Sequence, residues 1–332
     1  MNVNYTEEQE MLRAAARDFL EKECTDSVLK EIEGSGTGYS PELWEKIADL
    51  GWLGLVYPEQ YSGSGMNLAD LAVIYEEFGR AMFPSPYMST VVLAGLTILE
   101  AGSEELKSSV LPVIATGEEI IALAVNEPEL TGKGIHQDTD ITSIKAIPDG
   151  DEYVLNGSKQ FVQNAGIAGK YLVPAITGDI GSPGNGVTLF LVDSQSGGIS
   201  KTYLDTVSGD SQYEVVFDNV RVPRENIIGT LNEGWTPLEH SLQISAMMSS
   251  AQMLGAGQQL LELTIEDAEA RSQYDAKGID KYTEEHIANL RRDVEYCRQV
   301  VYEAANKLEA GEPFDFEGTV VKGWRDFAVQ NS

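Results

Sequence analysis

The sequence predicts a multidomain α+β protein, with helical domains at both ends of the chain and a β domain between them. Near the N-terminus, apolar residues recur every three or four positions, which is typical of amphipathic helices. From about residue 121, apolar and polar residues alternate, and Gly, Thr and Val become frequent, as in β-strands. Helical spacing then returns. We therefore expect an N-terminal all-α domain at 1–120, a middle β-barrel or sandwich at 121–228 and a C-terminal helical bundle at 229–332.

The composition is that of an ordinary globular protein apart from its charge. The 332 residues, of which 42% are hydrophobic, are enough to bury a large core. A formal net charge of -30 argues against nucleic acid and anionic membranes as partners, because like charges repel. No apolar run reaches the length of a membrane span, and the N-terminal residues are acidic and polar. Cys24 and Cys297 have no metal or redox spacing, so we expect a cytoplasmic protein.

Local signals place the first helices. Thr6, with Gln9 three residues later, forms a capping box, and an apolar stripe follows it. Ser40 before Pro41 marks another helix start, because proline is favoured in the first helical turn. A third helical pattern runs from Leu68 to Ala81. These signals predict that the N-terminal domain is helical.

Turn residues in the middle region predict antiparallel hairpins. Asp149-Gly150, Asn156-Gly157 and Gly197-Gly198 all consist of residue types that tight turns favour. A further strand is expected to end at Val222-Pro223, with the loop after it closing on Gly229. The repeated turns favour an antiparallel barrel or sandwich.

The last region predicts long helices. One spans about Thr236 to Ala270, and small residues around Gly255 in its middle would allow another helix to approach closely. A third helix is expected to begin near Phe316. The helix between them has apolar residues at alternating spacings of three and four, as in the seam of a bundle. Those residues are Ile287, Leu290, Val294, Cys297, Val301, Ala304 and Leu308.

Three segments of the middle region carry a more specific signal. AVNEPEL begins at Ala124, DGDEYVLNGSKQFVQNA at Asp149 and FDNVRVPRENIIG at Phe217. In this order and at these separations they resemble the middle domain of the acyl-CoA dehydrogenase family, whose usual wording is TEP, YxLNGxKxWIT and FxxVxVPxxNxLG. The order α, β, α also resembles that family over nearly the whole chain. The resemblance implies that FAD accepts hydride from the β-carbon of an acyl-CoA thioester while a glutamate takes the α-proton.

The resemblance implies two places for that glutamate, and this sequence fills neither. One lies on the long first helix of the last domain, where alignment on Gly255 gives Ser245, followed by Ala246 where Arg is frequent. A serine hydroxyl without a base partner does not take this proton, so we interpret Ser245 as a packing residue. The other place follows a GGxG segment that the chain lacks, so the C-terminal bundle is expected to be truncated. The carboxylates left open as substitutes are Glu233, Glu239 and Glu317.

The same resemblance implies where the flavin ring would lie. Asn126 corresponds to the Thr of TEP, and Phe161 corresponds to the Trp that often lies against the isoalloxazine ring. Gln163 corresponds to the Thr or Ser that faces flavin N5. Phe161 is also an apolar residue in a strand, so a role in the core is an equal alternative. The implied flavin contacts therefore differ from the usual family residues at all three positions.

One further segment resembles a family motif for the pyrophosphate of FAD. RSQYD, which begins at Arg271, resembles RxQFG at the end of the first bundle helix, and it includes Gln273 and Tyr274. A guanidinium group matches phosphate oxygens well, and in the family this arginine reaches a flavin held mainly by a neighbouring subunit. The alternative is an arginine that complements the dipole at the helix C-terminus.

Together these features resemble the short, degenerate subunit of heteromeric bacterial acyl-CoA dehydrogenases, some of which act on steroid side chains. The resemblance implies a non-catalytic subunit that supports the FAD of a full-length partner, in a heterotetramer with two copies of each. Acyl-CoA would be the substrate and electron-transfer flavoprotein the acceptor. Apolar helix faces that need a cover favour such a partner, because each exposed side chain forfeits roughly 1.5–3 kcal/mol. The alternatives are an autonomous FAD-dependent enzyme with a relocated base, and a flavin-free acyl-CoA-binding or scaffolding protein.

Overall fold

The computed structural model describes the chain except for residues 1–4, 128–141, 179–185, 208–209, 275–280 and 313–332. The chain divides into two compact units. Unit 1 combines Met1–Leu29, Met66–Phe83 and Gln243–Ser332, and unit 2 combines Lys30–Gly65 and Pro84–Leu242. Both units are therefore built from segments that lie far apart in the sequence.

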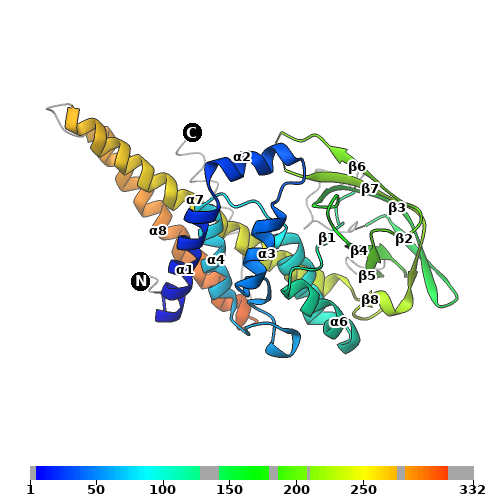
Figure 1. The fold of residues 1–332 in the computed structure, drawn as a ribbon. Coiled ribbons are helices and arrows are strands. Elements are labelled where there is room, and N and C mark those ends of the chain that lie inside the picture. Colours follow the sequence, from blue (N-terminus) through cyan, green and yellow to red (C-terminus); the bar gives the residue numbers. More distant parts are fainter. Residues whose placement is uncertain (1–4, 128–141, 179–185, 208–209, 275–280, 313–332) are drawn as a thin grey trace. The chain divides into compact units, whose positions relative to one another are not determined.

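Unit 1 is helical, and its two longest helices lie side by side (Figure 1). Leu254 and Leu261 of one pack with Leu290, Val294 and Cys297 of the other in a buried cluster. The apolar seam expected on the second of these helices is therefore confirmed. The helices are α1 Glu7–Glu23, α4 Leu68–Arg80, α7 Trp235–Tyr274 (in unit 1 from Gln243) and α8 Lys281–Glu309.

Side-chain caps fix where the helices of unit 1 begin. The predicted capping box at α1 is present, with the Gln9 N–H donating to Thr6 Oγ1 at 3.1 Å and the Thr6 N–H donating to Gln9 Oε1 at 3.1 Å. Asn67 and Asp70 form a second capping box at α4, which the sequence reading did not anticipate. Each box satisfies two backbone N–H groups that a helix start leaves unpaired.

Two glycines bring α4 and α7 into backbone contact within unit 1. A Cβ atom placed on Gly79 would lie 1.8 Å from the carbonyl oxygen of Gln252. A Cβ atom on Gly255 would lie 1.8 Å from the carbonyl oxygen of Glu76. Since no side chain fits at either point, the close approach expected from the small residues of α7 is confirmed.

Unit 2 joins short helices to a β-sheet. The α-helices are α2 Asp26–Ser35 (in unit 2 from Lys30), α3 Pro41–Asp49, α5 Leu96–Ala101 and α6 Glu104–Ala115, and η3 Met88–Gly95 is a π-helix. The 3-10 helices are η1 Trp52–Gly54, η2 Glu59–Tyr61 and η4 Arg224–Asn226. The strands are β1 Ile121–Leu123, β2 Lys145–Asp149, β3 Glu152–Gln163, β4 Lys170–Ile176, β5 Val187–Asp193, β6 Ile199–Leu204, β7 Gln212–Pro223 and β8 Ile227–Ile228. Helices thus give way to strands at β1, and strands to a helix after β8.

The sheet of unit 2 has the order β6-β7-β3-β2-β4-β5-β8 among the described residues, and β1 pairs with β4. Most neighbours are antiparallel, as expected, but β4 pairs in parallel with β1 and with β2. The longest ladder joins β3 and β7, and β7 ends at Pro223 as predicted. The long strand β3 therefore lies inside the sheet, with β2 on one side and β7 on the other.

The hairpin turn expected at Asn156-Gly157 is wrong. Strand β3 continues through these residues, and its register with β7 shifts between Leu155 and Gly157. Gly157 has a φ of +144°, and a Cβ atom there would lie 2.6 Å from Ile144 Cγ1. Local turn chemistry has thus been overridden by pairing with β7, and the glycine serves a bulge instead of a turn.

Two other turn predictions have different outcomes. The chain does reverse at Gly150 between β2 and β3, which pair as an antiparallel hairpin closing on Asp149 and Glu152. Gly197-Gly198 also forms a turn, but it joins β5 to β6, which are not neighbours in the sheet. The predicted hairpin at that point is therefore wrong, because β6 pairs with β7.

Some expectations are not tested by the fold. The helix expected near Phe316 lies outside the described residues, and the domain boundaries at 120 and 228 stay a prediction. Over the part of the chain that the structure describes, no helix is both long and apolar enough to cross a membrane.

We predict that Gly255→Ala destabilises the protein by on the order of 3 kcal/mol, because the new methyl group meets a backbone carbonyl that cannot rotate away. Chemical denaturation measures the loss. Gly34→Ala is the control: it lies in α2 with nothing within 4 Å, so it should keep or raise stability by up to about 1 kcal/mol. Equal effects of the two substitutions would refute the close crossing.

Candidate functional site

In unit 2, the three residues expected near a flavin ring lie on or beside the last part of β3. Phe161 and Gln163 belong to β3, and Asn126 lies in the segment after β1. The Gln160 N–H donates to the Asn126 carbonyl at 2.8 Å, which holds the two segments together. The structure thus brings Asn126 next to the strand that carries the other two residues.

Phe161 is not a core residue. Its side chain is 39% exposed, so the core role considered for it is wrong. The register with β7 shifts between Lys159 and Val162, and Phe161 has a φ of +52°, a conformation that a bulky residue rarely adopts. The bulge therefore holds an aromatic ring at the surface of the sheet.

The other two side chains of this group are also exposed and polar. Asn126 is exposed, and the Gln163 amide donates to Asp210 Oδ2 at 3.0 Å. The end of β3 and the segment bonded to it therefore carry one exposed aromatic ring and two exposed carboxamide groups.

Residues close in sequence to Asn126 and Phe161 form a buried ion pair that the sequence did not reveal. Lys159 Nζ lies 2.5 Å from Glu127 Oε1, and the two side chains are 0% and 1% exposed. Lys159 Nζ also donates to the Val125 carbonyl at 3.2 Å and to Thr142 Oγ1 at 3.0 Å. The signal was that Lys159 continues the alternation of the inward-facing Tyr153 and Leu155, since a buried ammonium group requires a carboxylate nearby.

Both members of the pair have perturbed pKa values. Burial lowers the pKa of Lys159 to about 8, and Glu127 partly opposes that change. Burial alone would raise the pKa of Glu127, but the charge of Lys159 and the hydrogen bonds from Lys159, Ser143 and Thr142 outweigh it and hold this pKa below its ordinary value. Both groups are therefore predominantly charged at neutral pH.

In unit 1, the expected base position lies on α7. Ser245 is half-buried there, and its backbone carbonyl accepts a hydrogen bond from Ser249 Oγ at 2.9 Å. The following residue, Ala246, accepts in the same way from Ser250. Of the open substitutes, Glu233 is exposed and Glu239 half-buried in unit 2, whereas Glu317 lies outside the described residues. Among the described side chains, no group of His, Cys, Asp and Glu could hold a metal ion.

Arg271 lies in the last turn of α7, where the sequence placed it. Its guanidinium is 80% exposed and forms an ion pair with Asp267 at 2.7 Å. An exposed pair of this kind contributes little to stability, so the guanidinium is available to a stronger acceptor. Gln273 and Tyr274 end the same helix, and their side chains lie outside the described residues.

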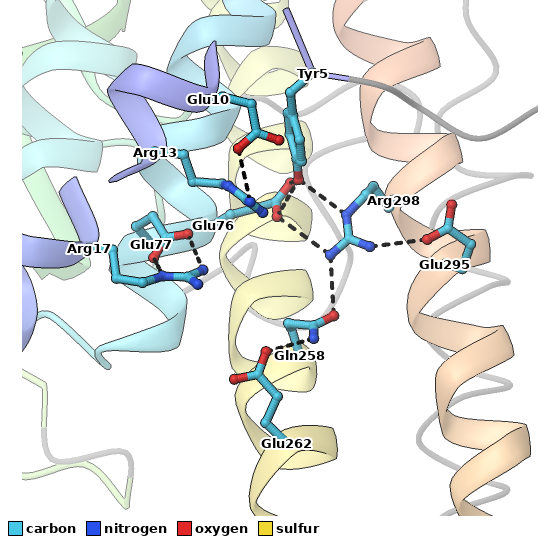
Figure 2. A network of polar contacts seen from close by, with 10 residues as sticks. All are labelled: Tyr5, Glu10, Arg13, Arg17, Glu76, Glu77, Gln258, Glu262, Glu295 and Arg298. Carbon is cyan, nitrogen blue, oxygen red and sulfur yellow. Dashed lines mark hydrogen bonds and ion pairs between the residues drawn. The ribbon is translucent and has the colours of Figure 1, made fainter. Parts of the chain in front are cut away.

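A second polar site lies within unit 1. A cavity of about 390 Å³ is lined by charged residues from α1, α4, α7 and α8. At its centre the Tyr5 hydroxyl donates to Glu76 at 3.0 Å and accepts from Arg298 Nε at 3.1 Å (Figure 2). Arg17 binds Glu77 through two hydrogen bonds, of 2.7 and 3.0 Å. The charged residues that line the cavity are Arg13, Arg17, Arg80 and Arg298 together with Glu76, Glu77, Glu262 and Glu295.

The lining of this cavity contains four arginines and four glutamates, so its formal charges balance. Burial raises the pKa of Tyr5 to about 12, with a further contribution from Glu76. Burial also raises the pKa of Glu76, and the positive charge of Arg298 opposes that change. We interpret the site as a structural network that fastens the N-terminal residues and α4 to the long helices.

Family models match nearly the entire chain. The N-terminal domain of acyl-CoA dehydrogenases matches residues 6–118, the middle domain matches 129–220 and the C-terminal domain matches 232–330. The chain is 30% identical to the caffeyl-CoA reductase-Etf complex subunit CarC of Acetobacterium woodii, over 96% of this chain and 84% of that protein.

Solved structures give the same result. Butyryl-CoA dehydrogenase from Megasphaera elsdenii is 28% identical, with a TM-score of 0.82 over 95% of this chain and 82% of that one. A variant of the Tcur3481-Tcur3483 steroid ACAD is 25% identical, with a TM-score of 0.78 over 92% of this chain and 78% of that one. The fold and the sequence therefore resemble the same family of proteins.

The raised pKa of Glu76 predicts a pH-dependent stability. The folded state holds the Glu76 proton more tightly than the unfolded state does, so this residue lowers stability as the pH rises above 4.5. Glu76→Gln removes the titration. We expect its free energy of unfolding, relative to that of the wild type, to rise with pH from 4.5 upward and then level off.

Urea denaturation at a series of pH values measures this difference. Ser250→Ala, a neutral exchange on α7, should differ from the wild type by the same amount at every pH, since it adds and removes no titrating group. A Glu76→Gln difference that falls as the pH rises would show that Arg298 overcompensates burial, and would contradict the prediction.

Proposed function

Since the chain belongs to the acyl-CoA dehydrogenase family, we propose that it is a subunit of a flavin-dependent enzyme acting on acyl-CoA thioesters, and that it supports FAD without supplying the general base. The observation that carries this proposal is Ser245. A serine followed by Ala246 occupies the position on α7 that the resemblance assigns to the base, and neither side chain accepts a proton at neutral pH. We propose that a partner polypeptide supplies the base that deprotonates the substrate.

The residues of unit 2 fit the ring of a flavin. An isoalloxazine ring needs an apolar surface and amide groups at its polar edge, and the exposed Phe161 ring with the Asn126 and Gln163 amides supplies both. When bound, FAD would supply hydride chemistry at the β-carbon of the acyl group. Asn126 and Phe161 would orient the ring, and Gln163 would lie toward its polar edge.

Arg271 fits the phosphate end of the same cofactor. Its exposed guanidinium has one carboxylate partner, Asp267, from the preceding turn, and a diphosphate is a stronger acceptor for the same donors. A helix C-terminus carries partial negative charge, which the arginine also offsets. An arginine that extends from the surface is suited to the cofactor of a neighbouring subunit.

Partners are proposed from the relatives. The Acetobacterium woodii relative is named as a subunit of a reductase-Etf complex, which supports electron-transfer flavoprotein as the redox partner. The steroid ACAD is named by two components, which supports a second, full-length subunit of the same family. The substrate class we propose is an acyl-CoA or enoyl-CoA thioester.

We predict that the chain produced alone does not oxidise acyl-CoA, whereas co-production with a full-length family member from the same organism gives a complex that contains FAD and is active. Flavin absorbance and bleaching by acyl-CoA measure the two properties. The control is the same partner produced without this chain. A purified, solitary chain that desaturates acyl-CoA would refute the proposal in favour of an autonomous enzyme, and a colourless complex would favour a flavin-free protein.

We predict that Arg271→Ala raises the dissociation constant of FAD in that complex by about 10- to 100-fold, because a charged hydrogen bond to phosphate contributes about 1.5–3 kcal/mol. Isothermal titration calorimetry of the apo complex measures the change. Arg292→Ala is the matched control, since Arg292 is also exposed and pairs with a neighbouring carboxylate on α8. An unchanged FAD affinity in Arg271→Ala would refute the phosphate role and leave the arginine as a partner of Asp267 and of the helix dipole.

A further inference from the structure

The Lys159–Glu127 pair of unit 2 is buried to a degree that calls for an explanation. The exposed fraction of the side chain is 0% for Lys159 and 1% for Glu127. Removing two charges from water is costly, and apolar residues of similar size often replace such pairs without loss of stability. A contribution to stability alone therefore does not account for the pair. Its role depends on the segments that it holds together.

The pair fastens three segments of unit 2. Lys159 lies on β3, and its ammonium group donates to the Val125 carbonyl at 3.2 Å in the segment after β1. Glu127 Oε2 accepts from the Ser143 N–H at 2.7 Å and from the Ser143 hydroxyl at 2.5 Å. Thr142 Oγ1 donates to Glu127 Oε1 at 2.5 Å. One buried carboxylate thus holds the residues just before β2 against the segment that follows β1.

These contacts surround Asn126. The carbonyl of the residue before it binds Lys159, and the residue after it is Glu127 itself. Its own carbonyl accepts from the Gln160 N–H, one residue beyond Lys159. The backbone of Asn126 is therefore fixed on both sides while its side chain remains exposed.

The same contacts lie at the start of the bulge that carries Phe161. Lys159 is the last residue of β3 in register with β7 before the shift, and its side chain points into the core. Phe161 then adopts a φ of +52° and exposes its ring. A strained backbone persists only where its surroundings determine it, and the anchored ammonium of Lys159, two residues before Phe161, is one such constraint.

We propose that Lys159 and Glu127 are positioning residues, which hold the Asn126 amide and the Phe161 ring in the arrangement that receives the isoalloxazine ring. The proposal rests on the proposed function, since it assumes that FAD binds at this face. The positioning role goes beyond the proposed function, because it concerns two residues that do not reach the surface and so do not touch the cofactor.

A double variant separates positioning from simple stability. Lys159→Met alone would leave Glu127 buried without its counter-ion, so the variant to use is Lys159→Met with Glu127→Gln. Methionine keeps the length and apolar volume of the lysine stem, and glutamine keeps the shape of the carboxylate. The variant therefore removes both charges and the tie to Val125 with little change in packing.

A second lysine–glutamate pair in unit 2 provides the matched control. Lys170, at the start of β4, forms an ion pair with Glu119, and their side chains are 33% and 16% exposed. Neither contacts Asn126 or Phe161 in any hydrogen bond described above. Lys170→Met with Glu119→Gln thus makes the same chemical change away from the proposed flavin face.

The first measurement needs no cofactor. Hydrogen–deuterium exchange of the full chain should show at least about tenfold faster exchange in peptides covering 121–127 and 158–163 of the Lys159→Met, Glu127→Gln variant, because the tie between β1 and β3 is lost. Peptides from β4 and β5 should keep their protection. Unchanged exchange in 121–127 and 158–163 would overturn the proposal, whether or not FAD binds.

The second measurement uses the complex with the full-length partner. We expect the double variant to bind FAD at least about tenfold more weakly and to shift the visible flavin bands, while the Lys170→Met, Glu119→Gln control matches the wild type. Wild-type affinity and spectrum in the Lys159→Met, Glu127→Gln complex would overturn the positioning role and leave the proposed function standing. A wild-type complex that binds no FAD would refute the proposed function, and the positioning role would fall with it.

Discussion

Burying charged side chains is the constraint on which both units depend. A buried charge is tolerated only with a counter-ion and with its remaining hydrogen-bonding groups satisfied. Unit 2 meets this condition with Lys159 and Glu127, which join β3 to the segments after β1 and before β2. Unit 1 meets it with Glu76 and Glu77 of α4, which bind Arg17 of α1, Arg298 of α8 and Tyr5, which precedes α1. In both, polar contacts inside the fold decide which segments stay together.

The order of helical and β regions was predictable because it rests on local rules. The capping box at Thr6 and the apolar seam on α8 depend only on residues within a few positions of one another, and the structure has both. The turn expected at Asn156-Gly157 failed because strand pairing is a long-range interaction: β7 lies opposite β3 along its length and turns the glycine into part of a bulge. Sequence spacing alone does not reveal which strand will be the neighbour.

The candidate site was predictable in part for the same reason. Asn126, Phe161 and Gln163 were located by a motif, but only the fold shows that Phe161 is exposed on a bulge and not in the core. Lys159 and Glu127 lie within the motifs, but the sequence did not predict their ion pair. The pair joins residues 32 positions apart, which sequence spacing does not reveal. The nature of residue 245 needed no structure, since a serine there excludes a carboxylate wherever the helix packs.

The crossing of α4 and α7 has a consequence for how this sequence can diverge. The atoms that would collide with a methyl group at Gly79 or Gly255 belong to main-chain carbonyls, so no exchange of a neighbouring side chain can make room for one. Any side chain at these two positions is therefore disfavoured, whether or not the protein turns over a substrate. Relatives that keep this crossing are therefore expected to keep both glycines whatever chemistry they perform, and the loss of either glycine would indicate a changed helix packing and not a change of chemistry.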